Sequence, residues 1–237
     1  MVPTRPMRTY LYKLTSDRGG APCAPPPPPG AGPLLSLAIC KPAIRRTAEP
    51  GDRILGLTSR VLEQRDGYPP VSIIYAAVVT DVLDATRYYG PRSPHRHRPD
   101  CIYGYDEATG ELLHTGRTGL HADPRHRRRD LGREGLYENA RILLSDQFTY
   151  LGQEALVVPE SLNRLRELAS ALGQGHRVIP SGKDASLDRE LATLFRRLGK
   201  LETRFTPQEV HADAYDHPAP GPADRCLPQR SMPTCRL

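Results

Sequence analysis

Several short stretches in the first two thirds of the chain alternate apolar and polar residues, which is the two-residue period of a half-buried β-strand. Residues 9–15 are the first of them. Residues 71–80 are rich in β-branched side chains and too apolar for an exposed face, so they predict a strand buried on both sides. Weaker strand patterns cover residues 34–39, 53–57, 101–103 and 140–151, the last as one long strand or a bent pair.

The period changes to that of an amphipathic helix in the last third of the chain. Residues 159–172 place four leucines at helical spacing and stop before Gly173. Residues 186–198 place apolar side chains on one face, with Ser186 as the predicted N-cap. Short strands with irregular connections, followed by two helices, predict an α+β fold rather than repeated βαβ units. We expect a small, strongly bent mixed β-barrel with these two C-terminal helices packed at one end.

Proline changes this picture by marking the segments that do not pack. The 237 residues include 25 prolines, five of them consecutive at residues 25–29 and another group after Thr206. We predict a single domain over residues 8–205, with a proline-rich loop at 22–33 and a basic, mobile loop at 116–135. Residues 206–237 are predicted to be a disordered tail.

The expected cellular compartment is inferred from the targeting and membrane-spanning segments that the sequence lacks. No apolar run reaches the roughly 20 residues that a transmembrane helix needs, and residues 1–8 lack the apolar core of a secretory signal. The five cysteines are an odd number, widely scattered and without a CxxC pair, which argues against a disulfide scaffold. We therefore expect a cytoplasmic protein with no membrane partner.

Net charge is compatible with a polyanionic partner but does not identify one. The formal charge is +6 and the isoelectric point is near 9.2, which suits a nucleic acid or a nucleotide. Of the 33 basic residues, 29 are arginine and four are lysine, a bias that GC-rich coding also produces. Both explanations stay open for the run at residues 125–129: it is either a docking arm for nucleic acid or a surface insertion.

Three groups of motifs, in this order along the chain, resemble a known family. They are the opening strand with Asp17-x-x-Gly-Ala-Pro22; then Leu37-Ala-Ile-Cys-Lys-Pro-Ala-Ile-Arg-Arg-Thr-Ala48, Gly51-Asp52-x-Ile54-x-Gly56-x-x-Ser59 and Ile74-Tyr-Ala-x-x-Val79-Thr80; then Leu143-Leu-Ser-Asp-x-Phe-x-Tyr-Leu-Gly152, Val158-Pro-x-x-Leu162 and Gly173-x-Gly-His-Arg177. The chain resembles, over roughly residues 8–201, the second of the nucleotide-modification-associated domain families. That family is placed in base-modification systems of phages and bacteria.

A looser similarity links the Gly-Asp turn and the Val-Thr strand to the PUA-like barrels of the EVE, ASCH and YTH groups. Those domains bind RNA or flipped, modified bases. The resemblance therefore implies binding of a modified base, a nucleotide or a nucleic acid in a base-modification pathway. The chain departs from the family after Gly20, where polyproline replaces the family's loop. The alternative is a small enzyme, a transferase or hydrolase acting on a nucleotide or modified base, although no P-loop, GxSxG or HExxH motif is present.

The best candidate site lies where a short apolar strand gives way to a turn of helix. Pro42 suits a first helical position, and Lys41, Arg45 and Arg46 surround it. These cations and free backbone N–H groups suit a phosphate. A solvated basic turn on a barrel rim is the alternative. Arg45 and Arg46 cannot point the same way on one helical turn, so a structural role stays open for one of them.

Cys40 is a weak candidate nucleophile, because cationic neighbours and a helix N-terminus favour a thiolate. The sequence identifies no base for it, and a cysteine that ends an apolar strand more often packs. Asp146 interrupts an apolar strand and is a candidate for reading a base edge, or more weakly for catalysis. Ser59, Tyr75 and Phe148 complete the predicted binding set, the aromatic rings as stacking faces for a base.

Histidine and cysteine positions in the middle of the chain invite a zinc hypothesis. They are His95, His97, Cys101, His114, His121 and His126. Their spacing matches no paired-ligand pattern. We therefore predict no metal site and no cofactor, with a nucleotide, DNA or RNA as the expected partner.

Overall fold

The computed structural model describes residues 5–106 and 108–206. Their strands are β1 (Arg8–Leu14), β2 (Leu35–Leu37), β3 (Arg53–Thr58), β4 (Ser72–Val78), β5 (Asp81–Leu83), β6 (Tyr103–Tyr105), β7 (Leu112–His114), β8 (Ile142–Ser145), β9 (Gln147–Tyr150), β10 (Leu156–Val157) and β11 (His176–Pro180). The helices are α1 (Pro42–Thr47), α2 (Arg60–Asp66), α3 (Ala85–Tyr89), α4 (Pro124–Leu131), α5 (Asn163–Ala171) and α6 (Ala185–Leu198). The predicted α+β class is confirmed.

The central sheet contains six strands in the order β10-β4-β3-β1-β11, with β9 also paired to β4. β1 runs parallel to β3 and antiparallel to β11. A register shift interrupts the β3–β4 pairing after Gly56. A Cβ atom at Gly56 would lie 2.2 Å from the Tyr75 ring, so only glycine lets these two strands approach.

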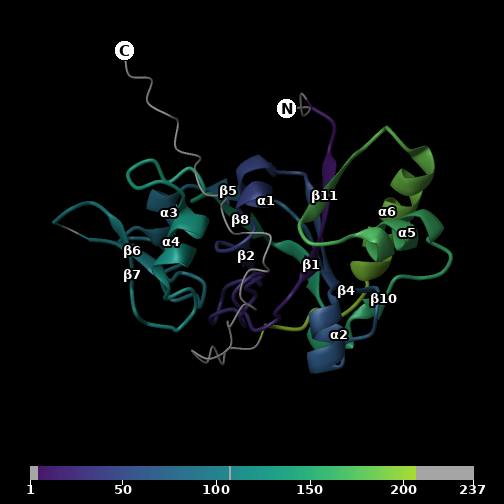
Figure 1. The fold of residues 1–237 in the computed structure, drawn as a ribbon, viewed down its shortest axis with the longest axis horizontal. Helices are drawn as coiled ribbons and strands as arrows, with labels where there is room; N and C mark the ends of the chain where they lie inside the picture. The colour runs from purple at the N-terminus through teal and green to yellow at the C-terminus, as the bar shows by residue number, and fades with distance from the viewer. Residues whose placement is uncertain (1–4, 107, 207–237) are drawn as a thin grey trace, which may run out of the picture.

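Both faces of the central sheet are buried, which explains the apolar character of its strands. Along β1, Tyr10 and Tyr12 face one core cluster, and Leu11 faces another. Helices α5 and α6 cover the second face (Figure 1), and α6 contributes Leu187, Leu191, Leu194 and Leu198 to it. This is the pattern that predicted the two late helices, and both are confirmed: α5 lies within the predicted range of 159–172, and α6 begins one residue before the predicted range of 186–198.

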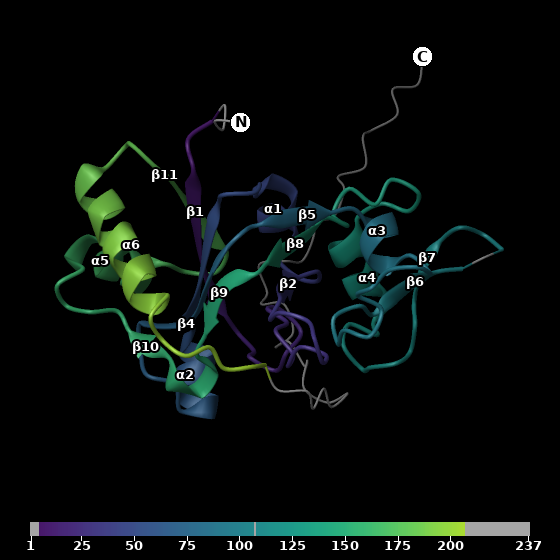
Figure 2. The ribbon, with the colours of Figure 1, turned by 180° about the vertical axis from the view of Figure 1, so that it is seen from behind.

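A second unit of structure packs on the other side of the central sheet. β2, β8 and β5 form a three-stranded sheet, and β6 pairs with β7. Helices α3 and α4 lie beside the β6–β7 hairpin (Figure 2), around a third core cluster that contains Tyr88, Tyr89 and Leu131. The predicted strand over residues 140–151 is a bent pair, β8 and β9, with Asp146 at the bend.

The structure corrects the prediction of a mobile loop over residues 116–135. Residues Pro124–Leu131 form helix α4, whose N-cap Asp123 accepts a hydrogen bond from Arg125 N. Only Asp130 and Leu131 of this helix are buried, so it has no repeated apolar stripe for a sequence pattern to detect.

Smaller corrections concern element ends and short helices. The N-cap of α6 is Asp184, whose carboxylate accepts from Ser186 N and Leu187 N, rather than Ser186. The strand expected at residues 101–103 lies at Tyr103–Tyr105, and the short helices α2 and α3 were not predicted. The predicted tail lies, apart from Thr206, outside the described residues. No helix within the described residues is long and apolar enough to cross a membrane.

Candidate active site

A strained turn connects strand β2 to helix α1 and carries Cys40. Cys40 and Lys41 have φ values of 57° and 44°, in the left-handed region, which costs roughly 1–3 kcal/mol for a residue other than glycine. Pro42 then begins α1, as predicted. In α/β-hydrolases, a sharp strand-to-helix turn presents the nucleophile. Strain of this kind persists only where surrounding contacts hold it.

The Cys40 thiol contacts His121, which in turn contacts Asp130, and both partners are distant from Cys40 in the sequence. Cys40 Sγ lies 3.3 Å from His121 Nε2, and His121 Nδ1 lies 2.5 Å from Asp130 Oδ2. The His121 and Asp130 side chains have no exposed surface, whereas Cys40 is half-buried. A thiol, an imidazole and a carboxylate in this order form the nucleophile, base and orienting group of a catalytic triad.

Asp130 also holds the backbone of the strained turn. Its Oδ1 accepts a hydrogen bond of 2.8 Å from Cys40 N, and its Oδ2 accepts one of 3.0 Å from Tyr103 Oη. Burial by itself would raise the pKa of Asp130, but the hydrogen bond and the charge of His121, with Arg45 and Cys40 N, hold that pKa below its usual value. Asp130 is therefore an ionised carboxylate that fixes both the imidazole and the main chain of Cys40.

The same contacts set the charge of His121. Burial by itself would lower the pKa of His121, but its hydrogen bonds with Asp130 and Cys40 raise the pKa to about 10. The imidazole is therefore protonated at neutral pH, with Nε2 directed at sulfur. An imidazolium next to a cysteine stabilises the thiolate, which is the reactive form.

Arg45 lies beneath this constellation and is completely buried. Its Nε donates to Cys40 O at 2.7 Å and its Nη2 to Asp130 O at 2.8 Å. Its Nη1 donates to Asn139 O and, at 3.0 Å, to Arg141 O. One guanidinium therefore joins the α1 turn, helix α4 and the segment before β8. Its donors face main-chain carbonyls and it has no exposed surface, which favours for Arg45 the structural role that the sequence left open for one of the two arginines; its phosphate role stays a prediction.

Lys41 and Arg46, the other two predicted phosphate ligands, have different environments. Lys41 Nζ lies 4.6 Å from the centre of the Tyr12 ring and donates to Lys13 O at 3.3 Å. Burial lowers the pKa of Lys41, and the charge of Arg129 lowers it further against the opposing effect of Cys40. Arg46 is exposed, and its Nη1 donates to Asn139 Oδ1 at 2.8 Å.

The remaining predicted site residues have contacts of their own, away from the Cys40 constellation. Ser59 Oγ accepts from Leu62 N as the N-cap of α2. Tyr75 is buried, with its hydroxyl 2.7 Å from the hydroxyl of Tyr12. Asp146 is exposed at the β8–β9 bend, and Phe148 is partly buried against the core. The contacts described for these four residues do not include His121 or Asp130, and their binding roles stay predictions.

Sequence reasoning identified Cys40 but not its partners. His121 was considered only as a zinc ligand, and Asp130 was not considered. The available signal was local: Asp123-Pro124 is a helix start, and Asp130 is an acidic residue that follows a run of arginines. No feature of the sequence shows that this helix lies against residue 40.

The same three side chains could be considered as a metal site, because one ligand atom from each lies within 4.8 Å of the others. The ring orientation argues for a triad instead. Nε2 faces Cys40, whereas Nδ1 faces Asp130. A cation between the sulfur and Nε2 would therefore lie on one side of the imidazole ring, and the Asp130 oxygen bonded to Nδ1 would lie on the other.

The chain matches a known protein family. The family model described as nucleotide modification associated domain 2 matches residues 7–210. No curated protein and no solved structure matches the chain.

Proposed function

Because the chain belongs to the nucleotide modification associated domain 2 family, we propose that it is an enzyme that acts on a nucleotide or modified base through Cys40. The contact chain from Cys40 Sγ through His121 to Asp130, with separations of 3.3 and 2.5 Å, carries this proposal. On the sequence alone the enzyme was the alternative to a binding module. Three titratable groups joined in catalytic order favour the enzyme.

The proposed reaction is acyl transfer, which cysteine–histidine pairs oriented by a third group catalyse on unrelated folds. The Cys40 thiolate attacks the carbonyl carbon of an acyl group on the base. A carbon–sulfur bond forms, the bond from that carbon to the base nitrogen breaks, and His121 gives its Nε2 proton to the departing nitrogen. Water then attacks the thioester in a hydrolase, or an amine in a transferase. His121 takes up the proton of the attacking group, and the thiolate leaves.

The finer predictions about the base remain part of this proposal. Two segments that cross between the sheets support a bent barrel of the PUA type. The chain passes from β4 in the central sheet into β5 in the three-stranded sheet, and later from β8 in the three-stranded sheet into β9 in the central sheet. Within such a barrel, Tyr75, Phe148 and Asp146 stay the predicted contacts to the base. A modified-base binding module without catalysis is the outcome if the thiol proves unreactive.

Two measurements test the proposal. The first follows acetate release from cytidine acetylated on its exocyclic amine, as nucleoside and within an oligonucleotide. Turnover should fall by several orders of magnitude in Cys40→Ala, and it should persist in Cys101→Ala, which removes a buried thiol outside the contact chain.

The second measurement follows alkylation by iodoacetamide, with the modified cysteine identified by peptide mapping. Among the three cysteines that the structure describes, Cys40 should react fastest at neutral pH, because Cys23 and Cys101 are buried, and the rate should fall in His121→Ala. Alkylation at the rate of a free model thiol, unaffected by His121→Ala, would refute a catalytic Cys40 and leave the binding module.

A further inference from the structure

Cationic side chains from two helices flank the Cys40 turn. Arg128 and Arg129 are adjacent and exposed on α4, and Arg46 is exposed on α1. Asn139 joins the two helices, because its Nδ2 donates to Arg129 O at 3.0 Å while its Oδ1 accepts from Arg46. Arg129 is also close enough to Lys41 for its charge to lower the pKa of that lysine. The positive charge therefore continues from α1, past the nucleophile, onto α4.

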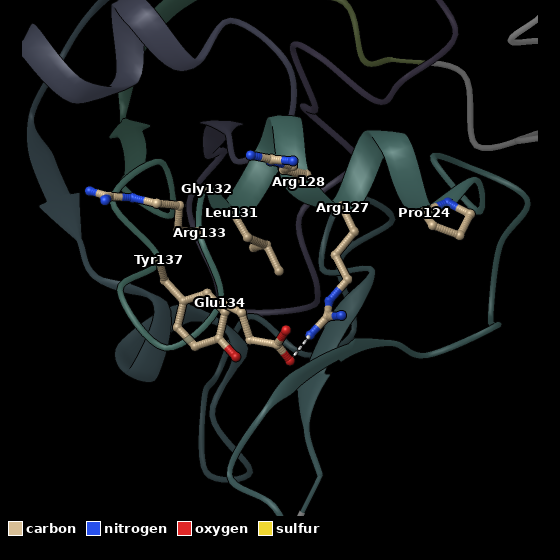
Figure 3. Close-up of a pocket in the computed structure, with 8 residues that line it drawn as sticks. All are labelled: Pro124, Arg127, Arg128, Leu131, Gly132, Arg133, Glu134 and Tyr137. Atoms are coloured by element: carbon tan, nitrogen blue, oxygen red, sulfur yellow. Dashed lines mark ion pairs between the residues drawn. The ribbon is translucent and has the colours of Figure 1, made fainter. Parts of the chain in front are cut away.

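A pocket of about 330 Å³ opens on the neighbouring face of α4 (Figure 3). Its wall contains the partly buried ring of Tyr137 and the buried Leu131, with Arg127, Arg128 and Arg133 around them. This volume is at the lower end of the range for small-ligand sites. An aromatic ring beside arginines suits one nucleoside with its phosphate, because every base has a face that stacks.

The arginines that line this pocket differ in whether their side-chain donors already bond to neighbouring residues. Arg127 donates to Leu112 O at 2.8 Å and lies 3.6 Å from Glu134, toward which Figure 3 shows it directed. Arg133 pairs with Glu138 at 3.1 Å. The main-chain carbonyl of Arg128 accepts from Gly132 N, but within the part of the chain that the structure describes its side chain has no hydrogen-bond or ion-pair partner. Arg128 is therefore the donor in this pocket that can bind a phosphate without breaking an existing contact.

We propose that these residues bind the phosphate backbone of a polynucleotide, so that the nucleotide on which Cys40 acts lies within a strand. This inference rests on the proposed function and specifies its substrate. Arg46 and Arg129 hold the phosphates beside the reacting nucleotide, and Arg128 holds the next one, with the adjacent nucleoside against Tyr137. A free mononucleotide would occupy only part of a surface that crosses two helices and continues into a separate pocket. Guanidinium groups suit this role because they bind phosphate oxygens in bidentate fashion.

The test compares binding of the protein to a fluorescent single-stranded oligonucleotide, as DNA and as RNA, by anisotropy across a range of salt concentrations. The Arg128→Ser/Arg129→Ser variant should lose about tenfold in affinity, and the slope of log affinity against log salt should become shallower by roughly 1.4, since each single-strand phosphate contact contributes about 0.7. The matched control is Arg196→Ser/Arg197→Ser, two exposed arginines in the last turn of α6. They lie across the central sheet from α4 (Figure 2), so affinity and slope should stay as in the wild type.

Competition with a mononucleotide separates the two sources of phosphate. A mononucleotide should displace the oligonucleotide only at far higher concentration, and its own affinity should change little in the α4 variant. Equal loss for both ligands would overturn the polynucleotide substrate in favour of a free nucleotide. Unchanged oligonucleotide affinity and salt slope in the α4 variant, or an equal loss in the α6 control, would refute the proposal that this surface binds phosphates.

The alkylation rate of Cys40 in the single variant Arg128→Ser keeps this inference distinct from the proposed function. Arg128 has no described contact with the thiol or with Lys41, so iodoacetamide should modify Cys40 at the wild-type rate in this variant. Normal alkylation with undiminished oligonucleotide binding would refute phosphate binding by this surface and leave the proposed catalytic role of Cys40 intact. If the α4 variant loses oligonucleotide binding but Cys40 is unreactive even in the wild type, phosphate binding by this surface is supported and the proposed enzyme is refuted.

Discussion

Replacing Arg45 with methionine is the strongest test of how the candidate site is held together. Methionine approximates the length of the arginine side chain but removes every donor, leaving four main-chain carbonyl oxygens without that partner. An unsatisfied buried polar group costs about 1–3 kcal/mol. Relaxation will restore some of these contacts, so if about two carbonyls stay unpaired the loss is about 4 kcal/mol. This is a large part of the 5–15 kcal/mol typical of a domain.

The assay is equilibrium unfolding in urea at pH 7, with Arg46→Met as the matched control. Arg46 is the adjacent residue on the same helix, but it is exposed and makes one hydrogen bond, to Asn139. Its replacement should cost below about 1 kcal/mol. Arg45→Lys should fall between the two, because lysine keeps the charge but cannot reach four carbonyls that are arranged around a planar guanidinium.

The Arg45→Lys variant also reports on the site if Arg45→Met does not fold. Arg45 holds the carbonyls of Cys40 and Asp130 together, so its loss should slow alkylation of Cys40 at neutral pH even in folded protein. The reasoning is refuted if Arg45→Met unfolds at the same urea concentration as Arg46→Met. That result would mean that water or relaxation satisfies the carbonyls at no cost.

Two further predictions concern titration and packing. The folded-state pKa of His121 is about 10, above the roughly 6.5 of an unfolded histidine, so its stabilisation is complete below pH 6.5 and is lost as the pH rises through 10. The urea midpoint should therefore decline from pH 6.5 to 10 in the wild type and decline less in His121→Gln; parallel profiles would contradict the assigned charge. Gly56→Ala should destabilise the fold by about 1–3 kcal/mol, because the new methyl group would lie 2.2 Å from the Tyr75 ring and 2.7 Å from Leu14. A melting temperature equal to that of Gly173→Ala, where the backbone is not left-handed and a methyl group meets open space, would show that the β3–β4 bulge absorbs the methyl group.

The sequence by itself determined the elements whose signal is local and repeated. β1 shows the two-residue period, β4 shows a continuous run of β-branched residues, α5 and α6 show leucines at helical spacing, and Pro42 marks the start of α1. Each of these signals lies within a single element, so it can be read from the chain without knowing which elements meet. The order of the motifs likewise indicated the family that the comparison then showed.

Only the tertiary structure decided where the chemistry lies. Helix α4 buries just Asp130 and Leu131, so it has no period, and His121 stands outside any regular element. The contact between Cys40 and His121 spans 81 positions of the chain. The sequence placed Arg45 and Arg46 together as phosphate ligands, yet one is buried under the turn and the other is exposed. A buried polar network depends on which groups meet across the fold, and single residues that meet this way leave no repeating pattern in the sequence.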